Sequence, residues 1–372
     1  MNQQNSPTTA LTEVRAPAAP SVHAAATEYY PWFDWLRIGL ASLVMLSHDS
    51  LLPAWPTAGN FAILAFFALS GWLIGGILLT TSQEQLPRFY FNRAVRIWVP
   101  YFLALAVLIA ISVLHDPLTA KWAEFVFYKI AFVYNLFGTQ QLVAHHFDMP
   151  LQGAGNHLAS VNAEEQFYLL APLLLVLSSR RISRNPLTWV LLLPLVWWAD
   201  TGVACLPLGV LAAVLAGRFR DFYRGVKARL ALILLLVTSG IGVVANVAYD
   251  LLAPVCSISL VLLLAIRGPQ HAIGALVGGM SYPLYLNHWL GIAISRSLDK
   301  RLEIVDSHGQ HVLAIVMSLA IAALLYWHVD RRILAARPRL YTRRLGLGAM
   351  AVAYCGVGLG IGVGLYLKLR HV

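Results

Sequence analysis

Charged residues are scarce in this sequence. They make up 12% of its 372 residues, whereas hydrophobic residues make up 59%, and the mean hydropathy is +0.67. A soluble domain of this length carries much more charge and less apolar surface. The composition therefore excludes a soluble globular protein and predicts an all-α polytopic membrane protein.

Cysteine is also rare. The three cysteines, Cys205, Cys256 and Cys355, lie in apolar stretches and show neither a CxxC pair nor the spacing of metal ligands. They predict neither a disulfide framework nor a zinc site. Residues 1–28 lack both the apolar core of a signal peptide and helical periodicity, so we expect a disordered cytoplasmic tail there.

Long apolar stretches dominate what remains. We expect about eleven transmembrane helices, several of them short. Residues 124–137 are aromatic and carry Lys129 in their middle, which favours an interfacial or half-inserted helix. The expected spans lie around residues 33–52, 60–80, 97–114, 161–178, 187–200, 202–217, 230–249, 251–266, 272–295, 311–329 and 346–367.

The basic residues predict an orientation. If the N-terminus is cytoplasmic and 124–137 does not span, the loops on the cytoplasmic side hold eighteen Lys and Arg residues and the outer connections and C-terminal end hold seven. Cytoplasmic loops retain basic residues, so this arrangement is the expected one. Most of the net charge of +10 then reflects the excess of basic residues in cytoplasmic loops, and no nucleic-acid partner is needed to explain it.

One pair of polar residues stands out in the first span. Arg37 and His48 are eleven residues apart within an apolar stretch, where a charge is costly and needs a reason. Eleven helical steps make three turns plus about 20°, so both side chains share one face, about 16 Å apart along the axis. The simpler alternative is an arginine that reaches a lipid headgroup and a histidine satisfied within the core.

Other polar residues separate by depth under this topology. Arg93 and Arg96 are expected near the cytoplasmic face, Ser70 near the middle, and Glu164 and His288 near the outer face. Guanidinium groups bind phosphates, and a histidine further out can take a proton from a hydroxyl group. The pattern suits a polyanionic cytoplasmic donor, a long thin connecting arm and an extracytoplasmic acceptor.

These residues carry a family resemblance. The chain resembles the acyltransferase family 3 integral membrane proteins, which transfer acyl groups from acyl-CoA to extracytoplasmic carbohydrates and some other hydroxylated acceptors. Five motifs match in order: Arg37 with His48, Phe66 to Leu73, Phe89 to Ile97, Glu164 to Tyr168, and Ser281 to His288.

Two motifs depart from the family pattern. Residues 159–161 read Ala-Ser-Val where the family usually has Trp-Ser-Leu, and residues 330–332 read Asp-Arg-Arg where it usually has Glu-Arg-Pro. The family fold is described with ten core spans, so the resemblance implies a tail at 1–28, an acyltransferase domain at 29–345, and an additional span within 346–372.

The resemblance also implies roles and a substrate class. The expected reaction is O-acetylation by acetyl-CoA, without a metal, of a polysaccharide or lipid-linked oligosaccharide at the bacterial inner membrane. Direct transfer and an acyl-histidine relay both fit. The residues expected to act are His48 as base and Glu164 in catalysis, Arg37, Ser70, Arg93 and Arg96 in acyl-CoA binding, and Tyr285 and His288 in acceptor binding.

Each role has a simpler alternative. Glu164 can complement a helix dipole, and Ser70 with Gly71 can serve close helix packing. A metal site is conceivable in the outer loop at His145, His146, Asp148 and His157, although we predict none. A transporter or flippase has a similar composition but is expected to show repeats, which we do not find, and a membrane scaffold leaves the Arg37 and His48 pair unexplained.

Overall fold

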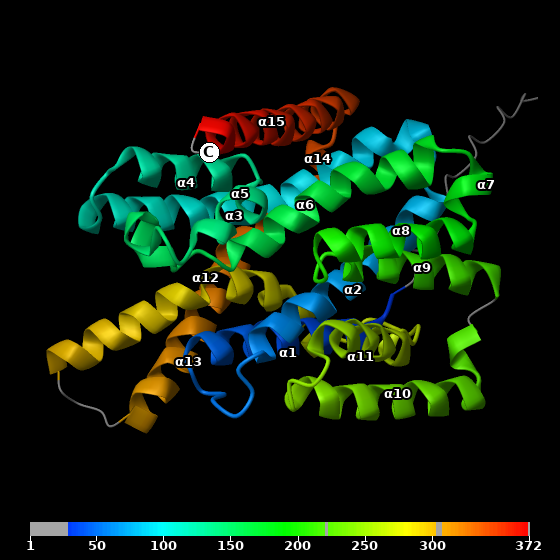
Figure 1. Ribbon diagram of the computed structural model, residues 1–372, viewed down its shortest axis with the longest axis horizontal. Helices are drawn as coiled ribbons and strands as arrows, with labels where there is room; N and C mark the ends of the chain where they lie inside the picture. The colour runs from blue at the N-terminus through cyan, green and yellow to red at the C-terminus, as the bar shows by residue number, and fades with distance from the viewer. Residues whose placement is uncertain (1–28, 220–221, 303–306, 371–372) are drawn as a thin grey trace, which may run out of the picture.

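The computed structural model describes residues 29–219, 222–302 and 307–370, and within these ranges the chain is helical with no strand (Figure 1). The predicted tail at 1–28 lies outside the described residues. The helices are α1 (Pro31–His48), α2 (Ala58–Thr80), α3 (Leu86–His115), α4 (Ala120–Ile130), α5 (Tyr134–Phe137), α6 (Leu158–Pro172), α7 (Arg180–Ser183), α8 (Pro186–Ala199), α9 (Cys205–Arg218), α10 (Val226–Val244), α11 (Tyr249–Leu264), α12 (Ala272–Leu302), α13 (Ser307–Leu325), α14 (Arg331–Leu340) and α15 (Arg343–Arg370), with π-helical turns at Leu173–Leu177 and Tyr326–Asp330.

Every predicted apolar stretch coincides with a helix, which confirms an all-α membrane protein. Five helical runs in the described residues are long and apolar enough to cross a bilayer, and α8, α9 and α11 are apolar but shorter. The total of eleven spans and the cytoplasmic N-terminus stay predictions. The five long runs are Ala58–Thr80, Gln83–His115, Val226–Val244, His308–Leu340 and Arg343–Arg370.

The aromatic segment 124–137 is divided. Helix α4 ends at Ile130, and Phe132 adopts a positive φ of 55° before α5 begins. Each piece is shorter than the roughly 20 residues that a span requires. Lys129 is buried here, with its Nζ 3.0 Å from the carbonyl oxygen of Gly155 and 3.3 Å from the centre of the Tyr134 ring.

Helix α1 lies at the centre of the bundle, between α2 and α12 (Figure 1). Helix α12 packs along α13 on one side, and α2 packs along α9 on the other. The approach of α2 to α9 requires glycine, because a Cβ atom added at Gly71 would lie 2.0 Å from the carbonyl oxygen of Leu206, and one added at Gly209 would lie 2.3 Å from that of Ala68. This packing fixes the distance between α2 and α9.

The final helix, α15, runs along the edge of the molecule against α3 (Figure 1). Tyr354 attaches it, with its hydroxyl 2.9 Å from that of Tyr90 on α3 and donating to the carbonyl oxygen of Leu169 at 2.8 Å. The site residues predicted from the sequence all lie on other helices. The division into domains at residue 345 stays a prediction.

Candidate active site

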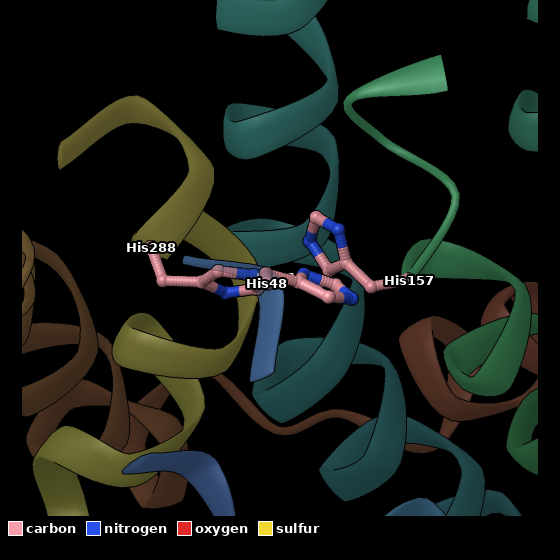
Figure 2. A group of neighbouring side chains, drawn as sticks. All are labelled: His48, His157 and His288. Atoms are coloured by element: carbon pink, nitrogen blue, oxygen red, sulfur yellow. Dashed lines mark hydrogen bonds between the residues drawn. The ribbon is translucent and has the colours of Figure 1, made fainter. Parts of the chain in front are cut away.

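Three histidines from separate segments meet beside the end of α1. Figure 2 shows His48, the last residue of α1, beside His288 of α12 and His157, which precedes α6. The Nδ1 atom of His48 lies 2.7 Å from Nε2 of His288, and the ring centres of His157 and His288 are 4.7 Å apart. We call these three residues the histidine cluster.

The members of the histidine cluster differ in access. His48 is exposed, whereas His288 is fully buried and His157 is 5% exposed. Each buried ring is tied to a backbone carbonyl of α12: Nδ1 of His288 lies 2.9 Å from the oxygen of Tyr285, and Nε2 of His157 lies 3.1 Å from that of Leu286. The rings of His157 and His288 are therefore fixed by the backbone, and the accessible ring of His48 packs beside them.

The histidine cluster is also the group of residues that could hold a metal in the described part of the chain. Its three ligand nitrogens lie within 4.8 Å of one another. Zinc to nitrogen distances of about 2.0 Å place tetrahedral ligand atoms roughly 3.3 Å apart. The 2.7 Å separation of the His48 and His288 nitrogens is shorter and matches a hydrogen bond.

The four loop residues that suggested a metal site, His145, His146, Asp148 and His157, do not gather at one point. His145 pairs with Asp148 at 3.2 Å, but His157 turns inward to the histidine cluster. This role of His157 was not predicted from the sequence. Its only signal was its place directly before the helix that bears the paired glutamates.

Tyr285 connects α12 to the segment before α6. Its hydroxyl donates to the carbonyl oxygen of His157 at 2.8 Å and contacts Ser160, and its ring meets Phe66 edge to face. Ser160 is the serine retained in the Ala-Ser-Val departure, so this polar contact exists without the family's tryptophan. Tyr285 thus helps to position His157 in the histidine cluster, and its own side chain is only 6% exposed.

Glu164 lies deeper than the sequence predicted. The Ser70 hydroxyl donates to its Oε1 at 2.6 Å, and the Tyr168 hydroxyl donates to its Oε2 at 3.2 Å. Because α6 begins at Leu158, earlier than the apolar window, Glu164 sits six residues into the helix, about 9 Å below its start. It is level with the middle of α2 and not with His48.

Ser70 and Gly71 have different roles, one in a polar contact and the other in close helix packing. Gly71 faces α9, where the backbones meet, and Ser70 faces Glu164 on α6. The packing explanation therefore applies to Gly71, and the polar one to Ser70. Glu165, the other acid of the pair, is 3% exposed and accepts from the Trp98 indole at 2.8 Å, on a different face of α6.

At the other end of α1, Arg37 lies 3.4 Å from the Asp34 carboxylate. Asp34 also accepts a hydrogen bond from Tyr29, which precedes α1. Burial and this hydrogen bond raise the pKa of Tyr29 to about 12, so its hydroxyl keeps its proton even in mildly alkaline solution. Helix α12 approaches Asp34 closely, since a Cβ atom at Gly278 would lie 2.6 Å from the Cβ atom of Asp34.

Arg93 and Arg96 of α3 come within electrostatic range of Arg37. The Arg93 guanidinium lies 5.7 Å from the ring centre of Phe89 and 5.6 Å from that of Tyr168, and its Nε atom is buried without a hydrogen-bond partner. We call Arg37, Arg93 and Arg96 the arginine cluster. Like charges held together in this way favour a polyanionic ligand.

Arg337 of α14 adds to this charge. It lies within electrostatic range of Arg96 and of Arg88, and Asp330 also acts on Arg96. From the sequence, Arg337 was expected only as one of the basic residues of a cytoplasmic loop. The predicted span ended at residue 329, whereas the helical run His308–Leu340 continues through Tyr326–Asp330 and includes Arg337.

The predicted site residues thus form one polar row. It runs from the arginine cluster through Glu164, on which Arg93 and Arg37 act electrostatically, and Ser70, to Tyr285 and the histidine cluster. Asp49, next to His48 in the sequence, is not part of the row. It turns to His311 at 2.8 Å and to Arg296 at 3.6 Å.

Comparison with known proteins identifies the family. A family model described as an acyltransferase domain matches residues 30–327. The chain belongs to acyltransferase family 3. The match covers both ends of the polar row, and it stops before α14 and α15.

Curated relatives share part of this region. The peptidoglycan O-acetyltransferase OatA of Listeria monocytogenes is 29% identical over 164 residues, which cover 43% of this chain and 26% of that protein. The O-acetyltransferase OatA of Staphylococcus aureus is 25% identical over 214 residues, covering 56% and 34%. The chain therefore spans only about a quarter to a third of these relatives. No solved structure matches.

Proposed function

We propose that this protein is a membrane O-acyltransferase that moves an acyl group, most simply acetyl, from cytoplasmic acyl-CoA to a hydroxyl group of an extracytoplasmic or lipid-linked carbohydrate. The observation that supports this proposal best is the polar row. It joins an exposed imidazole to a cluster of arginines through the interior of a membrane protein of the acyltransferase family.

The arginine cluster is the proposed binding site for the donor's phosphates. Arg37 and Arg93 are partly buried and Arg96 is exposed, so an anion can reach them from the surface. Guanidinium groups bind phosphate oxygens with forked hydrogen bonds. The acyl group must then reach His48, about 16 Å further along α1, which the long arm of coenzyme A allows.

Ser70 and Glu164 lie between these ends. We propose that they bind the amide groups of the donor's arm, because a hydroxyl and a carboxylate can accept and donate the hydrogen bonds that such groups need. Glu164 was predicted as a catalytic residue. Its bond to Ser70, on the path from the arginine cluster, supports a role in holding the donor.

The proposed transfer is direct. His48 takes the proton of the acceptor hydroxyl, the hydroxyl oxygen bonds to the thioester carbonyl carbon, and the carbon to sulfur bond breaks. The thiolate of coenzyme A then takes the proton from His48. An acyl-histidine relay uses the same residue and predicts in addition a covalent intermediate.

The acceptor is proposed from chemistry and from relatives. Two relatives carry the name O-acetyltransferase, one of them for peptidoglycan. A carbohydrate of the cell envelope at the bacterial inner membrane suits this site, because its hydroxyl groups can reach the exposed His48 beside the buried His157 and His288. Tyr285 is too buried to bind an acceptor directly, so its proposed part is to hold the histidine cluster.

Reconstituted protein tests this function. Purified protein in lipid vesicles is supplied with radiolabelled acetyl-CoA on one side and envelope glycan on the other, and base-labile label on the glycan is counted. We expect transfer by the wild type and none by His48→Ala. Acetyl-CoA should also raise the melting temperature, as a bound ligand does. Glycan movement across the membrane without ester formation would favour the transporter instead.

A further inference from the structure

We propose that His288 is a positioning residue that holds His48 in the tautomer with an unprotonated Nε2 atom. This inference rests on the proposed function, because it explains how His48 is ready to act as a base. It replaces the acceptor-binding role that the sequence suggested for His288, whose side chain is fully buried and bonded on both ring nitrogens.

The ring nitrogen of His288 that points away from His48 contacts the backbone. Its Nδ1 atom lies 2.9 Å from the carbonyl oxygen of Tyr285, and a carbonyl oxygen can only accept a hydrogen bond. The proton must therefore be on Nδ1. A neutral imidazole carries one proton, so Nε2 of His288 has a free lone pair.

This lone pair determines the tautomer of His48. The 2.7 Å contact between Nε2 of His288 and Nδ1 of His48 needs one donor, and His288 has none left on that side. His48 must donate from Nδ1. Its own Nε2 atom then carries the lone pair, on a side chain that is exposed and can meet an acceptor hydroxyl.

The surroundings keep His288 in place. The Ser318 hydroxyl of α13 donates to the carbonyl oxygen of His288 at 3.1 Å, and a Cβ atom at Gly291 would lie 2.5 Å from the backbone nitrogen of Ser318. Helices α12 and α13 are therefore in close contact at this level. The His288 ring cannot turn away without breaking its bond to Tyr285.

A neutral imidazole suits this position in a membrane. A base oriented by a third group is a common catalytic arrangement, and that group is often a carboxylate. A buried carboxylate is costly in a membrane unless it is paired with a cation. His288 provides the same acceptor without a charge, because its own proton is satisfied by the backbone.

Two polar substitutions separate the roles of the two ring nitrogens. His288→Gln can place its amide oxygen near the position of Nε2 and still accept from His48, whereas His288→Asn can bond to Tyr285 but is too short to reach His48. We expect kcat to fall by about 100-fold or more in the Asn variant and by about tenfold or less in the Gln variant, as for losses of orienting groups in other enzymes.

The KM for acetyl-CoA should change less than about threefold in both variants, because the arginine cluster is untouched. His115→Gln is the matched control, since His115 is exposed and its Nδ1 atom also contacts a backbone carbonyl, that of Ile111. A His288→Asn variant as active as the Gln variant, or a loss seen mainly in KM, would overturn the proposal.

A spectroscopic test does not depend on activity. In protein labelled with nitrogen-15 histidine, with His48 assigned by comparison with His48→Gln, the wild type should show a protonated Nδ1 and a bare Nε2 on His48. The same tautomer should persist in His288→Gln and be lost in His288→Asn. A protonated Nε2 in the wild type overturns the inference, even if acyl transfer is confirmed.

Metal analysis tests the alternative that the histidine cluster binds zinc. Purified wild-type protein is measured for zinc by mass spectrometry, with and without added zinc. We expect less than stoichiometric metal and unchanged transfer after chelation. One zinc per chain that disappears in His288→Asn would mean that the histidine cluster is a metal site. Absence of acyl transfer by the wild type would instead refute the proposed function.

Discussion

The two ends of the polar row are held in opposite ways. In the histidine cluster, both buried rings bond to backbone carbonyls of α12, and Nδ1 of His48 lies 2.7 Å from Nε2 of His288. In the arginine cluster, Arg37 contacts Asp34 at 3.4 Å and the Nε atom of Arg93 has no partner. One end is ordered by the protein's own hydrogen bonds, and the other brings like charges close together.

This difference has a physical reason. A base must hold its proton-accepting atom in one orientation before the reaction, and fixed neutral rings achieve this without burying charge. A site for several phosphates needs positive charges close together, which repel one another when the ligand is absent. We therefore expect substitutions at the histidine end to change kcat and those at the arginine end to change KM.

The largest expected effect is at His48. Replacement by alanine should lower kcat by about 100- to 10,000-fold, the usual contribution of general base catalysis. Acetyl-CoA should still raise the melting temperature, because the arginine cluster remains. Transfer is measured as release of coenzyme A thiol in the presence of glycan, and the comparison fails if donor binding disappears with the histidine.

Arg93 should show the converse pattern. Arg93→Ala removes hydrogen bonds to a charged group worth about 1.5–3 kcal/mol, which corresponds to a rise of about 10- to 100-fold in the KM for acetyl-CoA. The change in kcat should be smaller. Arg180→Ala, an exposed arginine in a neighbouring predicted cytoplasmic loop, is the control, and an equal effect there would indicate only a loss of surface charge.

Ser70 tests the middle of the row. Ser70→Ala removes the 2.6 Å hydrogen bond to Glu164, which at about 1.5 kcal/mol corresponds to a loss of roughly tenfold in kcat/KM. Thermal stability should change little, because Gly71 makes the close packing with α9. A large fall in melting temperature would assign Ser70 to packing. Steady-state kinetics and thermal unfolding in detergent distinguish the two results.

Tyr354 should have the smallest effect. Tyr354→Phe removes the hydroxyl that joins α15 to Tyr90 and Leu169, at a cost of about 1 kcal/mol and a melting temperature lower by about 2 °C. Both kinetic constants should remain as in the wild type. A change in either one would show that α15 takes part in the site, contrary to its position at the edge of the bundle.

Much of this architecture follows from local sequence. Apolar stretches of sufficient length predict helices, and a spacing of eleven residues places Arg37 and His48 on one face of α1. The family motifs then indicate which polar residues matter. Arg93 and Arg96 were expected together with Arg37, and the structure brings them within electrostatic range.

The remainder depends on contacts between distant segments. The pairing of His48 with His288 joins residues 240 positions apart, and His157 reaches them from a loop without helical periodicity. The depth of Glu164 depended on where α6 begins, and a hydropathy window cannot locate a helix start to within a turn. The place of Arg337 near Arg96 likewise depends on the course of α14, which the sequence pattern does not predict.

Acyl transfer by His48 is tested most directly by the ester content of the cell envelope. Base-labile O-acyl groups are measured on envelope glycans from a strain lacking this protein, complemented with wild type or with His48→Ala at equal membrane expression. Esters restored by the wild type and absent with His48→Ala are the predicted result. Equal restoration by both would contradict acyl transfer by His48.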